Sequence, residues 1–239
     1  MLENIKPERI LFLDIETVPL HASFDVMPEV EQKLWSNKAR NLKRTEVDTD
    51  ATIYPRAGIY AEFGKIICIS VSFLHHQSGS VKLRVRSFYG DDEKQILKDF
   101  SELLNKHFNS TDHFLCAHNG KEFDFPYLGR RMLINNLPLP YLLDLAGKKP
   151  WEVAHLDTLQ LWKFGDYKHY TPLNLLTHIF NIPSPKDDID GSDIYHVYYQ
   201  ENDLERIKNY CQKDVISVAQ LYLKFRNLPL LKEEQFEFV

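Results

Sequence analysis

One segment near the N-terminus constrains the fold more than any other. Residues 9–18 have the sequence Arg-Ile-Leu-Phe-Leu-Asp-Ile-Glu-Thr-Val, and the unbroken apolar run 10–13 predicts a buried β-strand that Pro19 closes. Side chains alternate between the two faces of a strand, so Asp14 and Glu16 project from the same side, about 7 Å apart. Two carboxylates this close are costly to bury, and each raises the pKa of the other. A divalent cation between them removes both costs, whereas a solvated strand end would need no ligand.

Composition and charge limit the classes of protein that this chain can be. The chain has 239 residues, 44% of them hydrophobic and 13% aromatic, which is enough for a sizeable packed core. We expect a single domain over residues 1–239, with residues 20–58 as a helical and loop insertion. Its net charge of −5 at pH 7 means that any nucleic-acid binding must use a local basic groove.

No targeting or redox signal stands out. No apolar run approaches the roughly 18 residues of a membrane span, and the N-terminus lacks the apolar core of a signal peptide. This predicts a cytoplasmic protein that does not bind membranes. Cys68, Cys116 and Cys211 lie in apolar patterns without ligand-like spacing, so we expect three buried free thiols.

The remaining elements predict an α/β fold. Apolar alternation and helical stripes, separated by turn residues, indicate a mixed sheet with helices packed on its faces. A capping box of Asn202 and Glu205 is expected to open the last helix. In the insertion, Val30 and Leu34 share one face of a helix. The expected strands are 65–74, 81–89 and 114–117, with a strand-like segment at 155–162; the expected helices are 27–42, one that begins at 91–93, 125–133, 173–180 and 204–225.

Two further segments carry acids at positions suited to a site. Residues 116–128 run from a strand through a turn into a helix, which places Asp124 at or near an N-cap. Capping alone would explain this residue, but strand-to-helix junctions are also where ligands collect in α/β proteins. On the last helix, Tyr210 and Asp214 lie one turn apart on the core-facing side. A buried Asp214 paired with an arginine, beside an ordinary core tyrosine, is the structural alternative.

Together these segments predict a metal site. Four clustered carboxylates repel one another unless cations lie between them, and hard oxygen ligands suit Mg²⁺ or Mn²⁺ better than zinc. Two such ions form the arrangement that supports phosphodiester hydrolysis.

The same residues resemble a known family. The segments Asp14-Ile-Glu16-Thr, Asn119-Gly-Lys-Glu-Phe-Asp124 and Tyr210-Cys-Gln-Lys-Asp214 are similar, in order and context, to the three exonuclease motifs of the tyrosine-bearing branch of the DEDD superfamily. The chain most resembles stand-alone 3′–5′ exonucleases related to the proofreading domain of family B DNA polymerases. The resemblance implies a ribonuclease H-like fold and the release of 5′-mononucleotides from single-stranded 3′ ends, with DNA favoured over RNA. It further implies a role in DNA repair or proofreading in trans, and it names no protein partner.

The resemblance also implies a role for each site residue. Asp14, Glu16, Asp124 and Asp214 would hold two Mg²⁺ or Mn²⁺ ions, and Tyr210 would orient the attacking water. The backbone around Glu16 and Thr17 would contact the terminal 3′-hydroxyl. Asn119 and Phe123 would contact the last nucleotides, Phe123 by stacking or wedging.

Several alternatives stay open at this point. An exoribonuclease of the RNase D or oligoribonuclease type would use the same metals and sheet, and a non-catalytic nucleic-acid-binding module could keep the acids for folding. Asp157 is either a fifth site carboxylate or, as we favour, a loop cap, and we expect His118 and His169 to be structural. Solvated surface charge is the default for the basic residues that could line a backbone path, namely Lys121, Arg130, Lys163, Lys168 and Lys186.

Overall fold

A six-stranded mixed sheet forms the centre of the molecule. The computed structural model describes residues 2–43, 45–77, 79–166, 170–183 and 188–239. The sheet order is β5-β4-β1-β2-β3-β6; β1 and β2 pair antiparallel, as do β2 and β3, and the other neighbours pair parallel. The α/β class and the mixed sheet are therefore confirmed. The strands are β1 (Ile10–Pro19), β2 (Gly64–Gln77), β3 (Ser80–Tyr89), β4 (Phe114–Ala117), β5 (Leu156–Asp157) and β6 (Phe236–Phe238).

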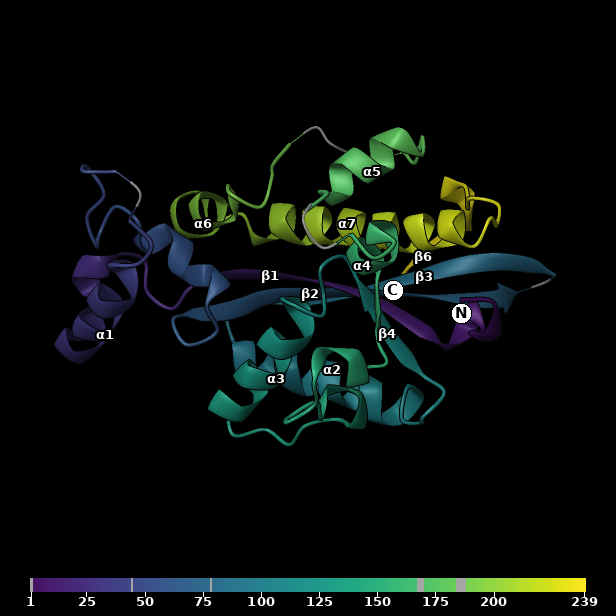
Figure 1. Cartoon of the computed structure of the whole chain (residues 1–239), viewed down its shortest axis with the longest axis horizontal. Coiled ribbons are helices and arrows are strands. Elements are labelled where there is room, and N and C mark those ends of the chain that lie inside the picture. The colour runs from purple at the N-terminus through teal and green to yellow at the C-terminus, as the bar shows by residue number, and fades with distance from the viewer. Residues whose placement is uncertain (1, 44, 78, 167–169, 184–187) are drawn as a thin grey trace.

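Helices cover both faces of this sheet. The long helix α7 lies along one face, and α2 and α3 lie on the other (Figure 1). No helix in the described part of the chain is both long and apolar enough to cross a membrane. The helices are α1 (Glu29–Ala39), α2 (Glu93–His107), α3 (Asp124–Ile134), α4 (Thr158–Lys163), α5 (Leu173–Ile179), α6 (Ile194–His196) and α7 (Leu204–Phe225).

The predicted alternation of side chains on β1 is confirmed. Ile10 and Phe12 pack with residues of α7, and the ring of Phe12 lies 5.5 Å from that of Tyr222. Leu11 and Leu13 pack on the opposite side, in the core under α2 and α3. Because strand faces alternate, Asp14 falls on the α7 side of the sheet.

The start of α7 differs from the expected capping box. Asp203 is the N-cap, and its carboxylate accepts a hydrogen bond from the backbone N–H of Arg206 at 3.0 Å. Asn202 instead adopts a left-handed conformation, with φ 55°, which asparagine tolerates better than most residues. Glu205 pairs with Lys208 and does not reach back to the cap. The predicted N-cap, Asn202, was therefore wrong by one residue, whereas the predicted helix bounds 204–225 are confirmed.

The segment 20–58, predicted to be an insertion, contributes to a small core of its own. Trp35 and Ala39 of α1 are buried against Tyr54, and the indole N–H of Trp35 donates to the carbonyl of Asp50 at 2.8 Å. Val30 and Leu34 both lie on α1, one turn apart as expected, and they are 69% and 56% exposed, so the face that they share points to solvent. The helix is also shorter than the predicted 27–42.

The apolar segment 155–162 is mostly helical. Only Leu156 and Asp157 form β5, and α4 follows directly. Periodicity does not distinguish a short buried strand from a short buried helix, which is why a strand-like segment was expected. The three cysteines are buried and free, as predicted.

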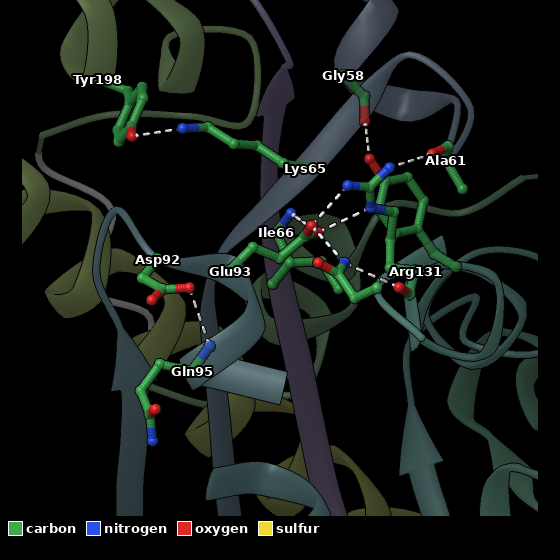
Figure 2. Close-up of polar contacts among 11 residues, drawn as sticks. Gly58, Ala61, Lys65, Ile66, Asp92, Glu93, Gln95, Arg131 and Tyr198 are labelled. Carbon is green, nitrogen blue, oxygen red and sulfur yellow. Dashed lines mark hydrogen bonds and ion pairs between the residues drawn. The ribbon is translucent and has the colours of Figure 1, made fainter. Parts of the chain in front are cut away.

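A buried ion pair fixes α3 against the sheet (Figure 2). Arg131 of α3 makes two hydrogen bonds to Glu93 at the start of α2, at 2.8 and 2.5 Å, and donates a third to the carbonyl of Ala61 at 2.8 Å. Glu93 also accepts the backbone N–H of Ile66 on β2 at 2.8 Å. Each charge is therefore compensated, and the helix that begins at Asp124 is anchored at its other end.

Candidate metal centre

The central strand presents its two acids where its pairing with β4 has ended. The β1–β4 ladder stops at Phe12 and Cys116, so the later residues of β1 are open on that side. One carboxylate oxygen from each of Asp14 and Glu16, and the sulfur of Cys211, all lie within 4.8 Å of one another. The two side chains therefore converge, as the alternation predicted.

Burial and mutual repulsion perturb both acids. The pKa of Asp14 is raised well above its ordinary value, first by burial and then by the charges of Asp214 and Asp124. The pKa of Glu16 is raised by burial and then by the charges of Asp14 and Asp214. Because a charge shifts the pKa of another group only at short range, the acids of three distant segments lie near one another.

Asp124 enters this environment from α3. It is the first residue of that helix, after the N-cap Phe123, and it is 4% exposed. Burial raises its pKa to about 7, although hydrogen bonds from its own backbone N–H and from that of Ile15 oppose the rise. The bond from Ile15 ties the carboxylate to the open edge of β1.

Tyr210 and Asp214 enter it from α7. Their side chains are hydrogen-bonded to each other. Burial, followed by the charges of Asp214, Glu16 and Asp14, raises the pKa of Tyr210 far above its ordinary value. In the metal-free protein the phenol is therefore protonated at neutral pH, so it can donate or accept a hydrogen bond.

Sequence reasoning missed a role for Cys211. Its thiol contacts both the backbone carbonyl of Asp14, at 3.4 Å, and the Asp14 carboxylate, at 3.3 Å. The position of Cys211 between Tyr210 and Asp214 could have suggested this role. A cysteine in an apolar pattern, however, is more often an ordinary residue of the hydrophobic core.

Asp157 is a cap, as favoured from the sequence. Its Oδ1 accepts backbone N–H groups from Leu159 and Gln160 at the start of α4, at 2.9 and 3.2 Å. The same carboxylate accepts the amides of Asn119 and Lys121, each at 3.1 Å. Four donors occupy its oxygens, so it is structural and not a fifth metal ligand.

The predicted structural role of His118 also agrees with its contacts. Its two ring nitrogens bond to the Thr158 hydroxyl and to the carbonyl of Thr171, both at 2.9 Å. Lys121 donates to the carbonyl of Val153 at 2.8 Å, which removes it from the proposed backbone path. Arg130 is exposed. His169, Lys168 and Lys186 lie outside the described residues.

The three predicted substrate-contacting residues lie beside Glu16 on β1 and in the turn that leads to Asp124. Thr17 follows Glu16 on β1 and is hydrogen-bonded to the hydroxyl of Tyr127. Asn119 has a left-handed backbone, with φ 66°, in the turn before α3. The ring of Phe123 is partly buried and packs on Tyr127, with ring centroids 5.3 Å apart.

A cleft opens beside the acids. It has a volume of about 640 Å³ and lies between α7, the start of α5 and the segment 188–193. Its lining includes Asp14, Tyr210 and Asp214, together with Tyr170 and Lys213, for which the sequence suggested no role in the site. Ligand pockets commonly have volumes in the range of about 300–1,000 Å³.

The donor set suits a hard divalent cation. Carboxylate oxygens are the ligands that Mg²⁺ and Mn²⁺ prefer. Repulsion and burial that raise the pKa of empty carboxylates are relieved when a cation lies between them. The acids on β1, α3 and α7 therefore form a group that could hold such ions.

These features define a class of protein. A mixed sheet with helices on both faces, carrying buried or partly buried acids on its central strand and on two helices, is an α/β architecture of the ribonuclease H-like exonuclease type. Residues 59–237 match a family described as a predicted 3′-5′ exonuclease related to the exonuclease domain of PolB, and this chain belongs to that family. The match begins after β1, so the positions of Asp14 and Glu16 beside the other acids come from the structure. No curated protein matches the sequence.

Proposed function

We propose that the protein is a metal-dependent 3′–5′ exonuclease that releases 5′-mononucleotides from single-stranded DNA. The observation that carries this proposal is the convergence of mutually repelling acids from β1, α3 and α7, of which Glu16 and Asp124 are buried. Membership in a family of predicted 3′-5′ exonucleases supports it. DNA repair, or proofreading in trans, is the context that we propose.

Each residue has a defined part in this reaction. Asp14, Glu16, Asp124 and Asp214 would hold two Mg²⁺ or Mn²⁺ ions. When bound, such ions lower the pKa of an attacking water and neutralise charge on the leaving oxygen. The protonated phenol of Tyr210, fixed by its bond to Asp214, orients the water for in-line attack.

The substrate contacts follow from positions around the acids. The backbone at Glu16 and Thr17 would bind the terminal 3′-hydroxyl, and the bond between Thr17 and Tyr127 holds this part of β1 in place. Asn119 and Phe123, in the turn before Asp124, would contact the last nucleotides. Arg130 remains a candidate for contacts to the phosphate backbone because it is exposed on α3.

Matched oligonucleotides test this function. We expect 5′-labelled single-stranded DNA to be shortened stepwise from its 3′ end in Mg²⁺ or Mn²⁺, faster than RNA of the same sequence, and not at all in EDTA. A 3′-phosphate should block the reaction. Asp14→Asn should abolish it, whereas Asp25→Asn, which alters an exposed acid of the insertion, should not.

The outcomes separate the candidate functions. Faster cleavage of RNA would favour an exoribonuclease of the RNase D or oligoribonuclease type. Binding of oligonucleotides without hydrolysis in any divalent cation would favour a non-catalytic binding module. Equal activity of wild type and Asp14→Asn would contradict the assignment of these acids as the catalytic site.

A further inference from the structure

An aromatic ring stands exposed at the edge of the acid site. Tyr170 lines the cleft that also contains Asp14 and Tyr210, yet its side chain is 64% exposed. Burial, followed by the charges of Asp124 and Asp157, raises its pKa, which places its hydroxyl near the start of α3. A large ring in such a place is available to a ligand.

The ring has a rigid support. The imidazole of His118 contacts it edge-on, with ring centroids 6.4 Å apart and planes at 66°. His118 itself cannot turn, because Thr158 and the carbonyl of Thr171 hold its two nitrogens. Burial lowers the pKa of His118, so the supporting ring is neutral. The position of Tyr170 is thus fixed by the end of β4, the strand beside β1.

The acidic lining of the cleft favours a nucleobase over a phosphate as its occupant. Among its described lining residues, Lys213 is the one fixed cation. Away from the acids that would hold the ions, a phosphate in this cleft would face the carboxylates of Asp190 and Asp193, whereas a nucleobase is uncharged and planar. The described acids that line it are Asp14, Asp188, Asp190, Asp193 and Asp214.

We propose that Tyr170, supported by His118, is the platform on which the base of the 3′-terminal nucleotide stacks. The base occupies the cleft, and its phosphate points back to the acids of β1. Every nucleobase has a π-face, so this contact recognises an unpaired 3′ end without selecting its sequence. The inference rests on the proposed function for the identity of the ligand, since it makes the occupant of the cleft a nucleic-acid end.

Equilibrium binding tests the platform without hydrolysis. A single-stranded DNA with 2-aminopurine at its 3′ terminus is titrated with protein in Ca²⁺, which is expected to replace Mg²⁺ without supporting cleavage. Stacking quenches 2-aminopurine, so we expect quenching by wild type, and weaker quenching when the probe lies five nucleotides from the end. Tyr170→Ala should weaken binding by about 10-fold to 100-fold, the usual effect of losing one stacked base.

Matched variants distinguish the loss of the aromatic face of Tyr170 from a general effect on folding. Tyr170→Phe and Tyr170→Trp keep an aromatic face and should bind and quench as wild type does. Tyr141→Ala removes another tyrosine that is 52% exposed, outside the cleft lining, and should change neither signal. His118→Ala should leave a measurable affinity but reduce the quenching at the terminal position, because the platform loses its support.

The experiment distinguishes a failure of the stacking platform from a failure of the exonuclease proposal. Stepwise hydrolysis by wild type, with unchanged affinity and quenching in Tyr170→Ala, would overturn the platform and leave the exonuclease intact. Quenching that depends on Tyr170, without hydrolysis in any metal, would keep the platform and remove the exonuclease. No binding of the single-stranded probe by folded wild type would overturn the platform.

Discussion

The sulfur of Cys211 lies 3.3 Å from Oδ2 of Asp14, so a thiol on α7 contacts a carboxylate on the central strand. The thiol is fully buried, and burial raises its pKa well above the ordinary value. It therefore acts as a neutral donor that fixes the direction of the Asp14 side chain. The contact joins β1 to α7 at the level of the proposed metal ligands.

Replacing this donor should reduce activity modestly. Cys211→Ser keeps a donor, whereas Cys211→Ala removes it, and one neutral hydrogen bond is worth about 1 kcal/mol. We expect kcat/KM on single-stranded DNA to be about fivefold lower for Cys211→Ala than for Cys211→Ser. Steady-state hydrolysis at saturating Mg²⁺ measures this, and equal values for the two variants would show that Cys211 only fills space.

Asp157 offers a test that separates capping from metal binding. Asp157→Ala leaves backbone N–H groups of α4 and of the turn at Asn119 without their acceptor, and loss of an N-cap costs about 0.5–2 kcal/mol. We expect a lower free energy of unfolding in urea and an unchanged Mn²⁺ affinity by calorimetry. If Asp157→Ala were as stable as wild type but lost Mn²⁺ affinity to the same extent as Asp14→Ala, Asp157 would be a metal ligand.

The buried pair of Glu93 and Arg131 should dominate the stability of the sheet–α3 contact. Both side chains are at least nine-tenths buried, so Glu93→Gln leaves the guanidinium without a counter-charge. Such a loss costs about 3–5 kcal/mol. In urea denaturation, the free energy of unfolding of Glu93→Gln should be lower than that of wild type by this amount.

An exposed pair provides the control. Glu29→Gln breaks the surface pair with Lys33 on α1, where i,i+4 pairs contribute no more than about 0.5 kcal/mol. Similar losses for Glu93→Gln and Glu29→Gln would contradict the structural role of the buried pair.

The raised pKa of Asp124 predicts how metal-free protein responds to pH. Between its ordinary value of 3.8 and about 7, the folded protein holds a proton that the unfolded chain has released. The free energy of unfolding therefore falls as pH rises through this window, with up to about 1.4 kcal/mol per pH unit from this group. Asp124→Asn cannot titrate and should show a shallower fall.

Thermal melts in EDTA at several pH values measure this difference. We expect the melting temperatures of wild type and Asp124→Asn to diverge between pH 5 and pH 7, and Mn²⁺ to remove the fall in wild type because a cation replaces the proton. Parallel curves for the two proteins would place the Asp124 carboxylate in an ordinary environment.

Local patterns in the sequence predicted much of the fold. The alternation on β1 and the long apolar stripe of α7 set their bounds, because each is a periodic signal over many residues. Short elements carried no such signal. The three-residue strand β6 was not expected, and neither was the cap at Asp203 one position after Asn202.

The sequence pointed to the acids of the candidate site but not to the side chains around them. Asp14, Glu16 and Asp124 belong to local patterns that the sequence displays, as do Tyr210 and Asp214. The contact of Cys211 with Asp14 spans 197 positions, and Tyr170 meets His118 only after β4 and the segment after α4 come together. Such contacts depend on tertiary packing, which no local pattern encodes.

Anomalous scattering from crystals soaked in Mn²⁺ tests the central claim most directly. We expect peaks between β1, the start of α3 and α7, within about 2.2 Å of carboxylate oxygens of Asp14 and Glu16, and their loss in Asp14→Asn. Well-ordered carboxylates with no Mn²⁺ among them, or Mn²⁺ bound only at other surfaces, would contradict the claim that these acids form one metal centre.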